Sequence, residues 1–126
     1  MKKKLLAAIA ASALLCGVLS APVSAAGYKK GDINMDGEIT VEDAQLAAKD
    51  YVEYLLAGNS HILTDEQLIL GNVDGVVDEF DTRTNPVSVS DAQIILCYYT
   101  DCLANSSISK LDITDYVKEY YPNFVK

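Results

Sequence analysis

The sequence lacks tryptophan, has one histidine and three cysteines, and its 10 basic residues are outnumbered by 18 acidic ones. Scarce histidine and cysteine argue against the usual zinc sites, which take their ligands from these two residue types. Cys97 and Cys102 are five residues apart, on different sides of any helix that contains both, so we expect free thiols and no mutual disulfide. The formal net charge of −8 argues against nucleic acid or an anionic membrane as a partner.

The first 25 residues have the pattern of a secretory signal peptide. Three lysines precede an apolar run from Leu5 to Leu19, and Val23-Ser24-Ala25 offers a small-residue cleavage site. The run is too short to span a membrane. We therefore expect a secreted protein that starts at residue 26, with no membrane insertion after cleavage and a net charge of −11. About 100 residues form one modest core and cannot easily also hold a deep substrate cleft, which argues against an enzyme.

One loop-and-helix unit occurs twice in the remaining chain. Residues 41–45 recur 48 positions later as residues 89–93, and residues 31–34 resemble residues 71–74. We predict two copies, over about residues 31–57 and 71–104. Apolar residues at helical spacing predict one helix in each copy. The two expected core stripes are Ala44, Ala47, Ala48, Tyr51 and Leu55, and Ala92, Ile95, Leu96, Tyr99 and Leu103.

Two further helices complete the expected fold, a small all-α domain over residues 26–105 with a tail over residues 106–126. Thr64 and Gln67 have the spacing of a capping box that opens a short helix ending at Gly71. The tail carries apolar residues at helical spacing and is expected to be helical up to Pro122. These tail residues are Ile113, Tyr116, Val117 and Tyr120.

Residues 32–43 have oxygen-bearing side chains at the first, third, fifth, ninth and twelfth positions, with Gly37 at the sixth. This is the spacing by which an EF-hand loop wraps Ca²⁺ with six to eight oxygens, although the twelfth residue is Asp where the usual pattern has Glu. The expected ligands are the side chains of Asp32, Asn34, Asp36 and Asp43, the carbonyl of Glu38, and Thr40 directly or through water. A plain turn before an acidic helix start is one alternative, and Mg²⁺ is another.

The second loop is longer: it spans 20 residues, from Asn72 to Asp91, where the first loop spans twelve. Asn72, Asp74, Ser88 and Asp91 match the first, third, ninth and twelfth positions. Of the inserted acids we expect Asp78, ahead of Asp81, to supply the missing fifth-position ligand. The alternative is a degenerate loop that no longer binds calcium, since Asn72 replaces a charged ligand.

With these motifs the chain resembles a dockerin over about residues 28–104. Residues 31–39 are similar to a dockerin's first repeat, and the paired Val-x-Asp-Ala-Gln segments with Tyr51 and Tyr98-Tyr99 look most like dockerins of ruminococcal cellulosome-type systems. The resemblance implies a duplicated calcium-loop-helix fold and calcium-dependent binding to a cohesin module of a scaffoldin or cell-surface protein. It also implies a context of polysaccharide degradation and a protein that is a monomer when free.

By position, the resemblance also implies partner contacts just before the closing Asp and along each outer helix face. These residues are Val41, Glu42, Ala48, Lys49 and Glu53 in the first copy and Val89, Ser90, Leu96, Cys97 and Asp101 in the second. Because the two sets differ in charge, we predict one dominant binding orientation. The competing function is a secreted calcium-binding protein without cohesin recognition. An enzyme with paired carboxylates is a weaker third possibility.

The helix expected in the second copy carries an additional stripe beside its core stripe. This stripe is formed by Ile94, Cys97, Tyr98 and Asp101. A helix that is apolar around most of its circumference is expected to be covered on two sides. The second cover is either the cohesin or the tail helix with Tyr116, Val117 and Tyr120. The sequence leaves this choice open.

Overall fold

A computed structural model describes residues 27–76, 78–80 and 83–124, so the predicted signal peptide lies outside the described residues. This part of the chain is mainly helical, as the sequence predicts, but it also contains a two-stranded antiparallel hairpin that was not predicted. The elements are α1 (Val41–Leu56), α2 (Asp65–Gly71), β1 (Asp78–Phe80), β2 (Arg83–Asn85), α3 (Val89–Ala104), the 3₁₀ turn η2 (Ile108–Lys110) and α4 (Ile113–Tyr120).

Capping boxes start three of the helices. At α2, the backbone N–H of Gln67 donates to the Thr64 hydroxyl at 3.3 Å, and the Thr64 N–H donates to the Gln67 side chain at 3.0 Å. Thr40 and Ser88 begin α1 and α3 in the same way, with an aspartate three residues on as the second member of the box. The predicted short helix with its end at Gly71 is therefore confirmed.

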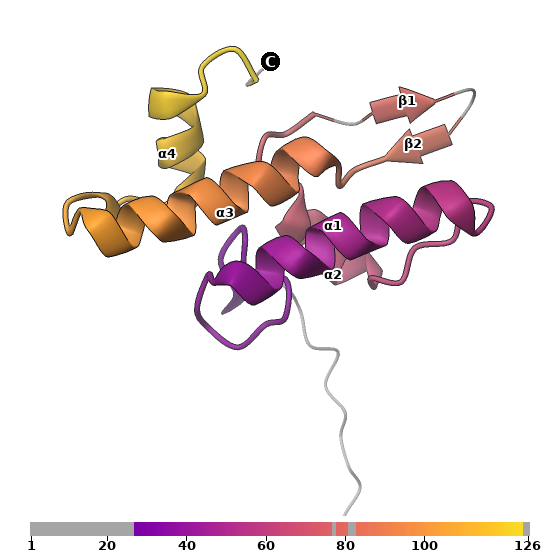
Figure 1. Cartoon of the computed structure of the whole chain (residues 1–126), viewed down its shortest axis with the longest axis horizontal. Coiled ribbons are helices and arrows are strands. Elements are labelled where there is room, and N and C mark those ends of the chain that lie inside the picture. The colour runs from indigo at the N-terminus through magenta and orange to yellow at the C-terminus, as the bar shows by residue number, and fades with distance from the viewer. Residues whose placement is uncertain (1–26, 77, 81–82, 125–126) are drawn as a thin grey trace, which may run out of the picture.

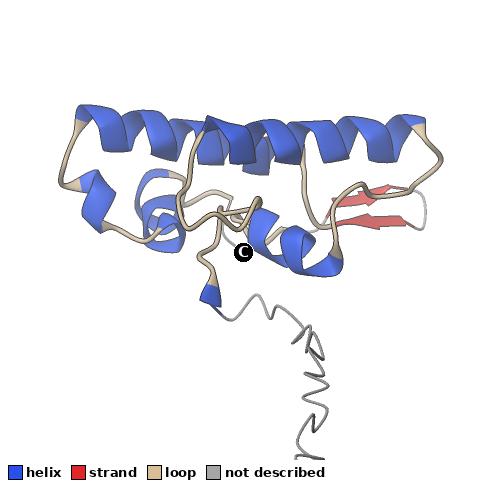
Figure 2. Ribbon diagram, turned by 90° about the horizontal axis from the view of Figure 1, so that it is seen from below, coloured by secondary structure: helices blue, strands red, loops and turns tan. Residues whose placement is uncertain are grey.

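The two long helices α1 and α3 run antiparallel along each other (Figure 1). The shorter helices, the loops and the hairpin all lie on one side of this pair, and the other side is left uncovered by the described chain (Figure 2). No helix in the described residues is long and apolar enough to cross a membrane.

This one-sided arrangement corrects part of the predicted core. Ala47 and Ile95 are fully buried as expected, whereas Leu55 is 46% and Leu103 72% exposed. Leu96 is also exposed, and Ala48, Tyr51 and Tyr99 are only half-buried. Sequence periodicity identified apolar positions, but the side of the helix that is covered depends on where the shorter elements pack.

The tail helix α4 packs against α3 and completes the core. Ile113, Tyr116 and Val117 are at most 1% exposed. The Tyr98 hydroxyl donates to the carbonyl of Leu111 at 2.7 Å, and the Tyr98 and Tyr116 rings meet edge to face with centroids 5.3 Å apart. The predicted tail helix is thus present, and it lies over α3.

The two loops meet through the glycine that precedes each of them. A Cβ on Gly71 would lie 2.9 Å from a methyl carbon of Val87 and 3.2 Å from one of Ile33. Gly31 has a φ of +90°, and its N–H donates to the carbonyl of Leu70 at 2.8 Å. A side chain at Gly71 would push the two repeats apart, and one at Gly31 would be strained at its positive φ and would crowd Ile39 and Ile113.

Candidate metal centre

Asp43 is the central residue of the first loop. Its carboxylate is fully buried and accepts N–H groups from both ends of the loop: Ile33 at 2.7 Å and Asn34 at 3.0 Å on one oxygen, and Thr40 at 2.8 Å on the other. One aspartate therefore caps α1 and also joins the start of the loop to its end. Its position twelfth in the loop is the position at which an EF-hand carboxylate closes on the cation.

Asp32, Asn34 and Asp36 shape the first half of the same loop. The Asp32 carboxylate accepts the N–H of Asp36 at 3.1 Å and of Gly37 at 3.0 Å, and Gly37 turns the chain with a φ of +97°. The Asn34 amide donates to the Asp36 carboxylate at 2.8 Å. The structure thus brings the predicted side-chain ligands Asp32, Asn34, Asp36 and Asp43 into one hydrogen-bonded loop, while the Glu38 side chain is exposed.

The second loop repeats the closure in equivalent residues. Asp91 is fully buried and accepts the N–H groups of Val73 at 2.8 Å, Asp74 at 3.2 Å and Ser88 at 2.8 Å. These three donors occupy the same loop positions as Ile33, Asn34 and Thr40. The alignment made from sequence, with an eight-residue insertion, therefore agrees with the hydrogen bonding of the backbone.

The first half of the second loop differs from that of the first. The Asn72 side chain folds back on its own loop, accepting the N–H of Gly75 at 2.7 Å and donating to the carbonyl of Val76 at 3.1 Å. The inserted residues form the hairpin β1–β2, with Asp78 opposite Asn85. The Asp78 side chain, the predicted fifth-position ligand, lies outside the described residues, as does Asp81.

Both loops concentrate negative charge in poorly solvated positions. Burial raises the pKa of Asp32 above its usual value, and the neighbouring charges of Asp43 and Asp36 raise it further against the effect of two backbone hydrogen bonds. Burial together with the charge of Asp74 raises the pKa of Asp91 to about 6. Carboxylates held close together in low solvent are stabilised in their charged form by a cation.

The donor chemistry of the first loop suits calcium. No group of three or more His, Cys, Asp or Glu side chains converges on one point in the described residues. An EF-hand loop also uses amide, hydroxyl and backbone oxygens, and Asn34, Thr40 and the Glu38 carbonyl are placed in this loop to supply them. Residues 32–43 therefore fit a hard cation that takes oxygen ligands.

The predicted partner residues divide into two groups. Val41, Glu42, Lys49, Val89 and Leu96 are exposed, and Ala48, Glu53 and Ser90 are half-exposed. In the stripe of Ile94, Cys97, Tyr98 and Asp101, Ile94 is 2% and Tyr98 8% exposed, and Asp101 accepts the Tyr116 hydroxyl at 2.6 Å. Of the two covers that the sequence left open, the tail is the one found over Tyr98 and Asp101, and Ile94 and Tyr98 are buried in the described chain.

Sequence reasoning missed the role of Asp50, which belongs to neither the apolar stripes nor the loop pattern. Its carboxylate is fully buried and accepts the N–H groups of Ile62 at 2.8 Å and Leu63 at 3.1 Å. His61 lies 2.7 Å from the same carboxylate and stacks on the Tyr54 ring with centroids 4.3 Å apart. Asp50 thus holds the loop between α1 and α2. The one sequence feature that could have indicated this contact is His61, the single histidine of the chain, three residues before the Thr64 cap.

We expect Asp50→Ala to lower the free energy of unfolding by about 2 to 3 kcal/mol, because the buried N–H of Leu63 and the partly buried N–H of Ile62 lose their acceptor. Chemical denaturation followed by circular dichroism measures this change. Lys49→Ala, at the exposed neighbouring position, is the control and should change stability by less than about 0.5 kcal/mol. Equal stability of the two variants would contradict the assigned role of Asp50.

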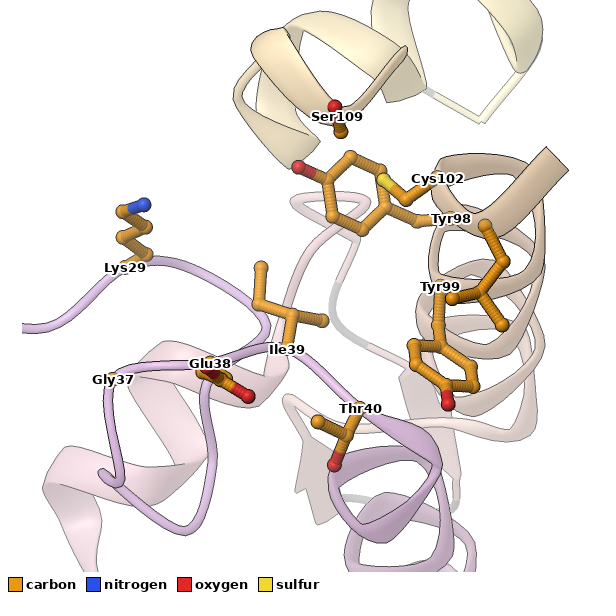
Figure 3. A pocket seen from close by; sticks show the side chains of 10 residues that line it. Lys29, Gly37, Glu38, Ile39, Thr40, Tyr98, Tyr99, Cys102 and Ser109 are labelled. Atoms are coloured by element: carbon orange, nitrogen blue, oxygen red, sulfur yellow. The ribbon is translucent and has the colours of Figure 1, made fainter. Parts of the chain in front are cut away.

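A shallow groove lies beside the first loop, between it and α3 (Figure 3). It has a volume of about 440 Å³, and Glu38 and Thr40 line it from the loop, with Tyr99 and Leu103 from α3. Glu38 is the carboxylate among the residues that line it. The groove marks where the first loop adjoins α3.

Comparison with known protein families, with curated proteins and with solved structures finds no match for this chain.

Proposed function

We propose that this protein is a secreted, calcium-dependent interaction module that binds a cohesin of a scaffoldin or cell-surface protein, in a polysaccharide-degrading assembly. The observation that carries the proposal is the duplicated closure of the loops, in which Asp43 and Asp91 each accept three equivalent backbone N–H groups. Each loop leads directly into a long helix, and the two helices lie side by side. This is the architecture that the dockerin resemblance implies.

Calcium has a structural role in this proposal. The ion would bind the side chains of the first loop, offset the charges that Asp32, Asp36 and Asp43 bring together, and fix the start of α1. Because a ligand that binds only the folded state stabilises it, calcium shifts the chain toward the form that presents its helix pair.

The uncovered side of the helix pair is the proposed docking face. Exposed or half-exposed residues repeat on it at the same spacing in both helices, 48 positions apart, and most of them are apolar. These residues, named here the docking stripe, are Val41, Gln45, Ala48, Val52 and Leu55 on α1 and Val89, Gln93, Leu96, Thr100 and Leu103 on α3. Large apolar side chains gathered on one face of a small protein favour a protein partner.

The borders of the docking stripe differ between the helices. Lys49 is exposed on α1, whereas its counterpart Cys97 is half-buried beside the Tyr121 hydroxyl. Glu53 likewise corresponds to Asp101, which is bonded to Tyr116. Since rim charges fix the orientation of a complex, these differences support the prediction of one dominant binding orientation.

The proposal is tested by measuring binding to a panel of cohesins in Ca²⁺ and in EDTA. We expect binding in calcium only, and a loss of at least about 30-fold in affinity for Leu96→Glu, since a charge would be buried at the centre of the interface. Ile69→Glu is the matched control, because Ile69 is 58% exposed but lies on α2, outside the docking stripe.

Full cohesin affinity in EDTA, or equal losses in the two glutamate variants, would contradict the proposal. Calcium-dependent folding without binding to any cohesin would favour the alternative function, a secreted calcium-binding protein.

A further inference from the structure

We infer that the second loop is closed by the chain's own Asn72 and Lys30 in place of a cation, so that each chain takes up one Ca²⁺, in the first loop. This inference rests on the calcium binding proposed for the first loop. It assigns the two copies different tasks: one responds to calcium, and the other stays folded without it.

The residue at the first position differs in both charge and donor chemistry. Asp32 presents two carboxylate oxygens, which accept the N–H groups of Asp36 and Gly37 and so fold the first half of the loop. Asn72 presents one oxygen, bonded to the Gly75 N–H, and an amide group that donates to the Val76 carbonyl. At its first position the second loop therefore has one ligand oxygen and one negative charge fewer than the first loop, and ligand charge is among the features that set calcium affinity. The Asn72 amide instead stabilises the turn through its hydrogen bond to the Val76 carbonyl.

Lys30 places a positive charge at the start of the second loop. Its ammonium donates to the carbonyls of Ile69 at 2.5 Å and Asn72 at 2.9 Å, which are exposed at the end of α2. The negative charge of Asp91 acts on this ammonium as well. A cation at a helix C-terminus is stabilising, and it offsets the carboxylate charge that a calcium ion would otherwise balance.

The sixth position differs between the loops. Gly37 turns the first loop with a φ of +97°. Counted back from the closing aspartate, its counterpart is Asn85, which ends β2 and is 1% exposed, and whose side-chain nitrogen has no hydrogen-bond partner among the described residues. Its oxygen is already used by the N–H of Val87 at 3.1 Å. The second loop therefore has two amide nitrogens, of Asn72 and Asn85, at positions where the first loop has a carboxylate and a glycine.

In the part of the chain that the structure describes, the first loop has no basic side chain in a position like that of Lys30. Among the described residues, no basic side chain forms an ion pair within 4.0 Å of Asp32, Asp36 or Asp43. Asp32 and Asp43 are at most 1% exposed, and poorly solvated carboxylates without a basic partner favour uptake of a divalent ion. Lys30 forms no ion pair within this distance either, but the carbonyls of Ile69 and Asn72 fix its ammonium at the start of the second loop, where the charge of Asp91 acts on it.

The stoichiometry of the unmodified chain is the decisive measurement. Native mass spectrometry and calorimetric titration with CaCl₂ alone are expected to give one ion per chain. Asp32→Asn should then lower the affinity for that ion by at least about tenfold, through loss of one ligand charge. Two ions per chain would overturn this inference and leave the proposed function standing, and Asp78→Asn would then show whether Asp78 serves the second ion. No bound ion would overturn the proposed function.

Hydrogen exchange gives a second test that needs no variant. In EDTA the amides of Val73, Asp74 and Ser88, which Asp91 holds, should keep their protection. The equivalent amides of the first loop, bonded to Asp43, should exchange at least about tenfold faster than in calcium. The first-loop amides are those of Ile33, Asn34 and Thr40. Equal loss of protection in both loops would overturn the inference.

Discussion

Replacing Asp43 with alanine should abolish calcium uptake by the first loop and lower the free energy of unfolding by at least about 3 kcal/mol. Three backbone N–H groups lose their acceptor, and each unsatisfied buried group costs about 1 to 3 kcal/mol. Small domains have only about 5 to 15 kcal/mol of stability in total, so the loss is a large share. The same change removes the carboxylate that is expected to close on the ion.

Denaturation in EDTA and in calcium separates these two effects of Asp43→Ala. In EDTA the stability loss reports the hydrogen bonds alone, and the further stabilisation that calcium gives the unmodified chain should be absent from the variant. Glu42→Ala is the matched control, because Glu42 is exposed one residue earlier in the same helix turn. Calcium stabilisation that survives in Asp43→Ala would contradict the assignment of Asp43 as a ligand.

Deletion of residues 106–126 should unfold the domain rather than simply shorten it. The deletion removes Ile113, Tyr116 and Val117, which are at most 1% exposed, together with Ile108 at 7%. Burial of side chains of this size contributes about 1.5 to 3 kcal/mol each, so their joint loss is comparable to the whole stability of a small domain. It would also expose the Tyr98 ring on α3, which packs against Tyr116.

Thermal unfolding and size-exclusion chromatography of the deleted chain measure this effect, with aggregation or a lost unfolding transition as the expected result. Tyr116→Ala tests the same contact at full length and should cost about 3 kcal/mol, as for other buried aromatic residues. Glu119→Ala, on the exposed side of α4, should be nearly neutral. A deleted chain with unchanged stability would show that the tail is not part of the core.

Local patterns explain why so much of the candidate site was predictable. The spacing of oxygen side chains in residues 32–43 and the repeat 48 positions later depend only on neighbouring residues, and a capping aspartate bonds within its own loop. The structure repeats the Asp43 closure at Asp91, as the alignment of the two copies implied. The short α2 helix and the tail helix were likewise predictable from caps and apolar spacing.

Contacts between distant segments were not predictable in this way. The role of Asp50 was not predicted, because the N–H groups that donate to its carboxylate, those of Ile62 and Leu63, lie beyond the end of its helix. Lys30 bonds to carbonyls about 40 residues away, which no local motif indicates. The hairpin formed from the insertion between Asp74 and Ser88 also escaped prediction, since two three-residue strands have too little pattern to identify.

The sequence by itself determined the duplicated unit, its helices and the spacing of oxygen-bearing side chains in the first loop, because these are set by spacing along one segment. Only the tertiary structure decided which apolar stripes are buried. Ile94 and Tyr98 are buried, and the tail packs on the Tyr98 ring, while Leu55, Leu96 and Leu103, equally apolar, stay exposed. The physical reason is that burial depends on what packs against a face, and periodicity describes only the face itself.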